Sequence, residues 1–167
     1  MDASYPAISP RRCIARPKGR NAGAIWANDD GAMNRILVAY HGGEAARRAL
    51  YAAAQLARAV HAQVGVISVV PLYPDRGPKT PAPWDNAATH QEHLEEAEAV
   101  FRASGIEPEL INLSGEPAEL IEREAASRGY DTIVMGGRRK NWFERLLTGS
   151  VMSDVVQRAE ATVVVVP

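Results

Sequence analysis

A glycine-rich, basic segment between positions 136 and 150 carries residue types that bind phosphate. It begins with Gly136-Gly137, continues through Arg138-Arg139-Lys140 and ends at Gly149-Ser150, where a helix is expected to start. Backbone N–H groups at a helix N-terminus attract anions, and glycines let a ligand approach the backbone closely. We therefore expect the N–H groups around Gly149, Ser150 and Val151 to hold a phosphate, with the basic side chains as countercharge.

A simpler interpretation of the same segment is purely structural. Serine is a favoured N-cap residue, so Gly149-Ser150 could open a helix with no ligand present, while Arg138, Arg139 and Lys140 lie in solvent. The chain has no Walker-type Gly-Lys-Ser sequence, and Ser150 lacks the Gly-x-Ser-x-Gly elbow of hydrolases. We therefore expect neither a dedicated ATPase nor a nucleophilic serine.

The elements that must position this segment follow from an alternation of apolar runs and amphipathic stretches. Short, wholly apolar runs are typical of strands covered on both faces, and small apolar residues at helical spacing predict the helices between them. The expected strands are 36–40, 64–70, 109–113, 131–136 and 161–166. The expected helices are 44–61, 87–104, a third from Pro117 to Gly129 and a fourth that starts at Ser150.

This alternation predicts a single α/β domain. Five strands and four helices in turn favour a doubly wound, Rossmann-like sheet of mainly parallel strands with right-handed crossovers. Ligands bind such sheets beyond the carboxyl ends of the strands, where the strand order reverses. The loops after Tyr40, Val70, Leu113 and Met135 are therefore the expected place of a binding site.

Composition limits the class of protein. A length of 167 residues suits one domain with additional chain, and a formal net charge of -1 gives no overall attraction to nucleic acids or acidic membranes. No apolar run approaches the roughly 18 residues of a membrane span. The single cysteine, Cys13, excludes an internal disulfide and fits a reducing compartment. We expect a soluble, cytoplasmic protein whose partners are neither membranes nor nucleic acids.

The first 32 residues differ from the rest of the chain. They lack an apolar period and carry basic side chains at positions 11, 12, 16, 18 and 20. We expect a disordered basic extension over 1–32, because low hydrophobicity and local charge disfavour folding, and a folded domain over 33–167. Two alternatives stay open: translation begins at Met33, or the extension is an arm that grips nucleic acid.

Taken together, the motifs resemble the universal stress protein family over roughly residues 34–167. The nucleotide loop of that family is Gly, two residues, Gly, nine residues, then Gly followed by Ser or Thr. Gly136, Gly149 and Ser150 keep this spacing, whereas the second glycine position holds Arg139. Further family-like segments are Ile36-Leu37-Val38-Ala39, Gly115-Glu116-Pro117-Ala118 and Asp131-Thr132-Ile133-Val134-Met135-Gly136.

The resemblance implies a stress-response protein of the adenine nucleotide α-hydrolase-like fold that binds ATP without fast catalysis. It implies Mg²⁺ only together with the nucleotide. It places adenine near Val69 and Met135 and the ribose near His41 and Gly136. The residues implied at the phosphates are Arg138, Arg139, Gly149, Ser150 and Val151.

Two departures from the family pattern bear on nucleotide binding. ATP-binding members usually carry an aspartate where this chain has His41, and a neutral histidine offers one donor and one acceptor, whereas a carboxylate only accepts. Arg139 costs about 1 kcal/mol if its backbone needs a positive φ, yet a guanidinium also binds phosphate well. The alternative function is a nucleotide-free interaction module that contacts another protein through residues 138–140 and the proline-rich segment.

The last predicted strand raises the question of assembly. Val163–Val166 form an apolar, β-branched edge, and an uncovered edge of this kind invites pairing. Members of the resembled family commonly dimerise through this strand, so the resemblance implies a homodimer. The alternative is an edge that is shielded within the monomer.

Several other residues are expected to have structural roles. His90 and His93 lie one helical turn apart, but no third metal ligand follows from the sequence, so we expect a solvated helix face. His61, at the end of the first helix, is expected to complement the helix dipole. Trp142 and Phe143 are expected to pack the basic loop against the domain.

Overall fold

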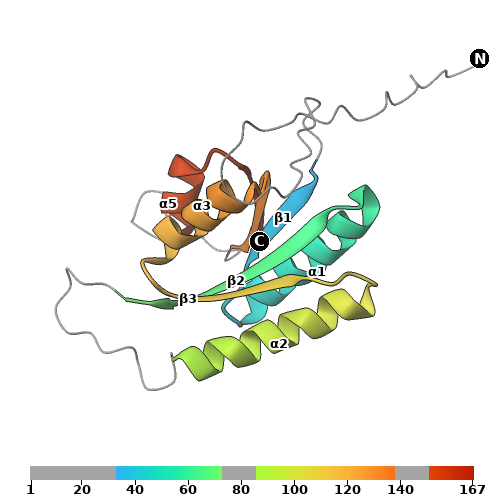
Figure 1. Cartoon of the computed structure of the whole chain (residues 1–167), viewed down its shortest axis with the longest axis horizontal. Helices are drawn as coiled ribbons and strands as arrows, with labels where there is room; N and C mark the ends of the chain where they lie inside the picture. The colour runs from blue at the N-terminus through green and yellow to red at the C-terminus, as the bar shows by residue number, and fades with distance from the viewer. Residues whose placement is uncertain (1–32, 73–85, 138–150) are drawn as a thin grey trace, which may run out of the picture. The chain divides into compact units, whose positions relative to one another are not determined.

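The computed structural model describes residues 33–72, 86–137 and 151–167. The disordered extension predicted over 1–32 lies outside this part of the chain. Strands and helices alternate along it as the sequence predicts (Figure 1). The elements are β1 (Arg35–Ala39), α1 (Glu44–Val60), β2 (Gln63–Pro71), α2 (Ala87–Ala103), β3 (Glu109–Gly115), α3 (Pro117–Arg128), β4 (Thr132–Gly136), α5 (Val151–Arg158) and β5 (Thr162–Val166).

The strands of the described chain form one sheet in the order β3-β2-β1-β4-β5. Each neighbouring pair is parallel, which confirms the predicted doubly wound α/β fold. β1 is central, and its Ala39 is in register with Ile67 of β2 and Met135 of β4. The strand order reverses between β1 and β4, so the carboxyl ends of these two strands mark the expected ligand site.

Helices cover both faces of this sheet (Figure 1). α1 and α2 pack on one face, around a core that includes the fully buried Leu50 and Phe101. α3 and α5 pack on the other face, around Ile133 and Val155. Val60, the last residue of α1, is 43% exposed.

The helix ends follow from residue type. α3 has Pro117 in its first turn, and it ends at Gly129, whose φ of 70° lies in the left-handed region that glycine adopts at little cost. α1 ends one residue earlier than predicted. His61 follows it as a C-cap with a φ of 56°, and its backbone N–H donates to the carbonyl of Ala57. The contribution of His61 at this position is thus a backbone hydrogen bond.

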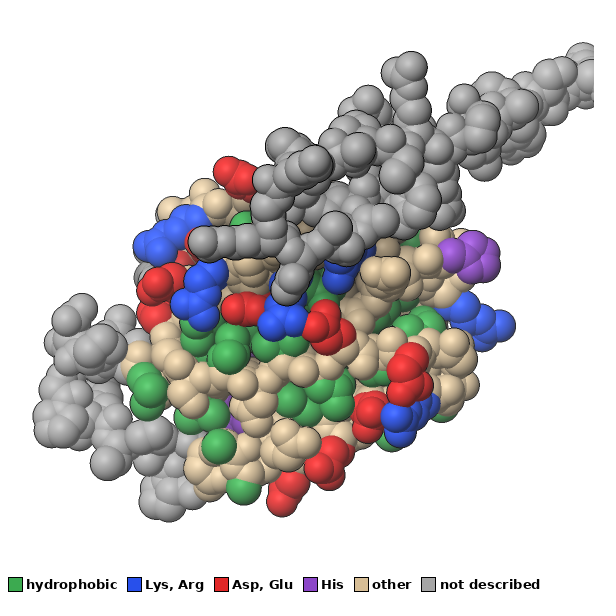
Figure 2. Space-filling view, in the orientation of Figure 1, with side chains coloured by type: hydrophobic (Ala, Val, Ile, Leu, Met, Phe, Trp, Pro, Cys, Tyr) green, Lys and Arg blue, Asp and Glu red, His purple; other side chains and the backbone are tan. Residues whose placement is uncertain are grey.

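Acidic and basic side chains are interspersed over the face of the molecule seen in Figure 2. Among the described residues, opposite charges pair around two arginines: Arg102 with Glu98 and Glu107, and Arg128 with Glu109 and Glu124. Interspersed charges produce only a weak long-range field. No helix in the described ranges has the length and apolarity needed to cross a membrane.

Candidate functional site

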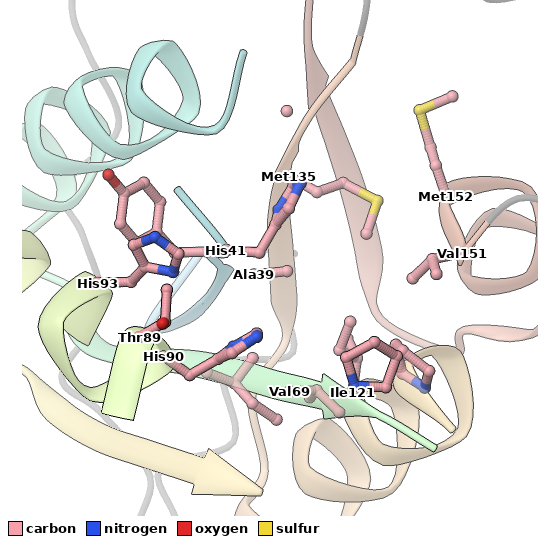
Figure 3. Close-up of a pocket in the computed structure, with 15 residues that line it drawn as sticks. Ala39, His41, Val69, Thr89, His90, His93, Ile121, Met135, Val151 and Met152 are labelled. Carbon is pink, nitrogen blue, oxygen red and sulfur yellow. The ribbon is translucent and has the colours of Figure 1, made fainter. Parts of the chain in front are cut away.

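A cavity of about 390 Å³ lies at the carboxyl ends of β1, β2 and β4, at the point where the strand order reverses (Figure 3). Its lining comes from these strand ends, from the turn after β1 and from helices on both faces of the sheet. The lining residues are Ala39, Tyr40, His41, Ile67, Val69, Pro71, Thr89, His90, His93, Pro117, Ile121, Met135, Gly136, Val151 and Met152.

Two larger hollows lie elsewhere on the described chain. One of about 620 Å³ includes Arg35 and Glu109 at the amino ends of β1 and β3, and one of about 680 Å³ lies beside α3 and the start of β5. Volume alone would favour these two. We favour the cavity of about 390 Å³ because it lies at the carboxyl ends of the strands, where doubly wound sheets bind ligands.

The structure brings five of the predicted site residues together around this cavity: His41, Val69, Met135, Gly136 and Val151. They come from four different segments of the chain. The other predicted residues, Arg138, Arg139, Gly149 and Ser150, lie outside the described ranges, as do Lys140, Trp142 and Phe143.

An apolar floor forms one side of the cavity. Ala39 lies between Ile67 and Met135 in adjacent strands, and all three pack with the core on the α3 and α5 face. Val69 continues the floor along β2, and it is 7% exposed. The small side chain of Ala39 between two larger neighbours leaves room above the middle of the sheet. Such a surface suits a flat, uncharged ring.

Gly136, at the carboxyl end of β4, lets α1 approach the sheet. A Cβ atom at this position would lie 2.5 Å from the carbonyl carbon and oxygen of Ala45 and 2.7 Å from the backbone nitrogen of Ala46. The next residue, Gly137, donates its N–H to the carbonyl of Val166 at 2.7 Å. The first glycine of the predicted phosphate loop is thus needed for packing, whether or not a ligand is present.

The prediction of a solvated face for His90 and His93 is wrong. His90 is 3% exposed, and its Nδ1 lies 2.7 Å from the hydroxyl of Ser68 on β2. The ring of His93 packs edge-on against those of His90 and Tyr40, with centroid distances of 5.7 and 6.0 Å. The physical reason is that His90 continues the inward stripe of α2, four residues before the buried Leu94.

His93 occupies a tight, desolvated position beside the turn after β1. Gly42 in that turn has a φ of 75° and is buried, and a Cβ there would overlap Nε2 of His93. The Nδ1 atom of His93 is buried without a hydrogen-bond partner. Burial lowers the pKa of His93 below its ordinary value, and the neighbouring His90 lowers it further. The surroundings of this imidazole therefore favour its neutral form.

A hydrogen-bonded bridge connects the cavity to α1 and α2. The hydroxyl of Tyr40 donates to one carboxylate oxygen of Glu96, and Nε of Arg47 donates to the other, each at 2.7 Å. Burial and the hydrogen bond to Glu96 raise the pKa of Tyr40 to about 12. Burial alone would raise the pKa of Glu96, but the hydrogen bonds from Tyr40 and Arg47 outweigh it and lower that pKa. Both carboxylate oxygens of Glu96 therefore already accept a hydrogen bond within the protein.

Sequence reasoning missed the part of the lining that comes from α2: Thr89, His90 and His93. The spacing of His90, Leu94, Ala97 and Phe101 was the signal that could have found the buried histidine, because it keeps the helical period. Within the described ranges, no group of three His, Cys, Asp or Glu side chains is placed to hold a metal ion. The arrangement instead offers hydrogen-bonding groups beside an apolar floor.

Comparison with known proteins places the chain among relatives of this fold. A sequence model of the universal stress protein family matches residues 33–167. A universal stress protein of Methanocaldococcus jannaschii is 28% identical over 148 residues, which are 86% of this chain and 87% of the relative.

Solved structures show the same likeness. The universal stress protein UspA from Lactobacillus plantarum superposes with a TM-score of 0.65 at 26% identity, and the match covers 81% of this chain and 98% of that one. A universal stress protein from Archaeoglobus fulgidus, solved in complex with dAMP, has a TM-score of 0.58 at 26% identity, with coverage of 81% and 98%. The chain therefore belongs to the universal stress protein family.

Proposed function

We propose that this protein binds an adenine nucleotide, with ATP as the expected ligand, in the cavity at the carboxyl ends of β1, β2 and β4. The observation that carries the proposal is the convergence of His41, Val69, Met135, Gly136 and Val151 on one cavity. The resemblance to the universal stress protein family implied nucleotide contacts for His41, Val69, Met135 and Gly136, and the expected helix start implied one for Val151. Their common lining of a cavity at the switch point supports that role.

Size and chemistry of the cavity agree with a nucleoside. A volume of about 390 Å³ lies at the lower end of the range for small-molecule sites, roughly 300 to 1,000 Å³. The floor of Ala39, Val69 and Met135 would lie under the base, with His41 and Gly136 beside the ribose. The related Archaeoglobus fulgidus protein in complex with dAMP supports an adenine ligand.

The phosphates would extend toward the start of α5. Val151 is the first residue of that helix, and backbone N–H groups at a helix N-terminus attract phosphate. In this proposal Arg138, Arg139, Gly149 and Ser150 complete the phosphate site, and Mg²⁺ enters only with the nucleotide. No side chain of the described lining is assigned as a general base, so we propose that the protein senses or buffers the nucleotide without fast turnover. We also propose that it is cytoplasmic.

Calorimetric titration with ATP, ADP and AMP tests this proposal. We expect micromolar affinity for at least one of the three, since a preformed apolar floor needs little reorganisation. Release of inorganic phosphate from ATP, followed in the same samples, should stay slow. Millimolar or absent binding of all three nucleotides would contradict the proposal and favour a nucleotide-free interaction module.

Arg139 is expected to contribute to ATP binding through its charge. A charged hydrogen bond contributes about 1.5–3 kcal/mol, so Arg139→Ala should weaken ATP binding by at least about tenfold. Adenosine, which lacks phosphate, should bind Arg139→Ala and wild type equally. Arg58→Ala, in the last turn of α1, removes the same charge far along the chain from the loop and serves as control. Tighter ATP binding by Arg139→Gly would instead mean that Arg139 obstructs the loop.

We also propose a homodimer that forms through β5. This strand lies at one end of the strand order, and its side chains Val163–Val166 are only half-buried. Edge strands of this kind pair with other chains unless they are covered. Light scattering should give about twice the mass of the 18.1 kDa chain at micromolar concentration. A single-chain mass across a dilution series would contradict the dimer.

A further inference from the structure

Part of the cavity wall is built from aromatic, titratable side chains. The ring of His93 lies edge to face against those of Tyr40 and His90, and all three residues line the cavity. Figure 3 shows the two histidines. His90 is tied to Ser68 on β2. Nδ1 of His93 is buried as well, but it has no hydrogen-bond partner. A buried nitrogen without a partner costs free energy, and the cost rises when the ring takes up a proton.

The charged and titratable groups that face His93 come from its own helix and from α1. On its own helix they are His90, Glu92 and Glu96, and on α1 the facing charge is Arg47. Glu96 already accepts hydrogen bonds from Tyr40 and Arg47, and the side chain of Glu92 is exposed to solvent. His41, on the turn after β1, is a further titratable group of the same lining. Desolvation, His90 and Arg47 oppose a charge on His93, and together they outweigh Glu96 and Glu92, which favour it.

A charged His93 would have to leave its place. Its ring lies so close to Gly42 that even a methyl group there would overlap it. Movement toward water or toward Glu92 would therefore remove the contact that supports the turn after β1. That turn carries Tyr40 and His41, which both line the cavity. The shape of the cavity thus depends on a neutral imidazole at position 93.

We propose that protonation of His93 lowers the affinity of the cavity for its ligand, so that proton concentration regulates nucleotide binding. This inference rests on the proposed function, because it concerns the occupancy of the same cavity. Linkage makes the effect reciprocal. If the ligand binds more tightly when His93 is neutral, saturating ligand must lower the proton affinity of His93 by the same factor.

Binding measured from pH 7.5 down to one pH unit below the pKa of His93, as NMR titration of the free protein gives it, tests the coupling. Adenosine is the probe, because the phosphate of a nucleotide titrates near pH 6 and would add its own pH dependence. The dissociation constant of wild type should rise as the pH falls, by up to about tenfold for each pH unit below the pKa of His93. ATP titrations of wild type and His93→Phe should differ in slope by the same amount.

Matched variants identify the responsible group. His93→Phe keeps an aromatic ring beside Tyr40 and cannot titrate, so its affinity for adenosine should change less than twofold over this range. His61→Gln should retain the slope of wild type. His61 is a suitable control because it is an exposed histidine beyond the end of α1. A slope that persists in His93→Phe, or that disappears in His61→Gln, would overturn the assignment.

NMR titration of the wild-type protein tests the proposal without relying on these variants. Titration of the histidine ring signals by NMR should show a lower pKa for His93 with saturating adenosine than without it. An unchanged pKa would overturn the proposal. Absence of any binding at pH 7.5 would contradict the proposed function and this inference together. Binding at pH 7.5 with an equal affinity one pH unit below the pKa of His93 would contradict this inference alone.

Discussion

Replacing Gly136 by alanine is expected to destabilise the domain by about 3 kcal/mol, or roughly 10 °C in Tm. The added Cβ would lie within 2.7 Å of three backbone atoms of Ala45 and Ala46 in the first turn of α1. Backbone atoms cannot rotate aside as a flexible side chain can, so α1 must move as a body. That helix carries Leu50 and five buried alanines against the sheet, and a shift would open this core.

Gly129→Ala provides the matched control for this prediction. Gly129 has a φ of 70°, and a Cβ at this position would meet nothing within 4 Å. The control therefore measures backbone strain alone, about 1 kcal/mol. Calorimetric unfolding of both variants in the absence of nucleotide should give the larger loss for Gly136→Ala. A loss equal to or smaller than that of Gly129→Ala would show that α1 adjusts without cost.

This role of Gly136 changes what the glycine motif says about function. The motif was interpreted as a phosphate loop because its glycines keep the spacing of a nucleotide-binding family. At Gly136, close packing of α1 is sufficient to require glycine. A family member could lose its ligand and still keep this residue. Evidence for nucleotide binding must therefore come from the cavity and from direct titration.

The fold was predictable because parallel sheets impose a strong local pattern. Strand 36–40 is apolar throughout, strand 64–70 is apolar apart from Ser68, and the helices between the strands show a clear period. The same pattern predicted the place of the site, because the carboxyl ends of parallel strands share one edge. His41 and Met135 are 94 positions apart in the sequence, yet both line the cavity.

The contribution of α2 to the site was not predictable from the sequence. His90 and His93 were interpreted as a solvated face because histidine is polar and no third metal ligand accompanied them. Helical spacing could have indicated that His90 is buried, but its place in the site depends on where α2 packs against β2 and on the hydroxyl of Ser68. Neither is visible in local periodicity. A polar residue on the buried stripe of a helix is better interpreted as a buried hydrogen-bonding group.

Replacing Ala39 by leucine is expected to weaken adenine nucleotide binding by at least about 100-fold while the fold persists. Ala39 is the small residue between Ile67 and Met135 on adjacent strands, and it lies at the floor of the cavity. The larger side chain would occupy the space proposed for the base. Because this space is open, we expect the free energy of unfolding to change by less than about 1.5 kcal/mol.

Ala99→Leu makes the same chemical change on the exposed face of α2. It should bind ATP as wild type does, and calorimetric unfolding should confirm that both variants are folded before titration. Wild-type affinity in Ala39→Leu would mean that the base does not lie over the strand ends, and the ligand site would then have to be sought elsewhere. Loss of adenosine and ATP binding to a similar extent would locate the effect at the base, since a change in the phosphate site would spare adenosine.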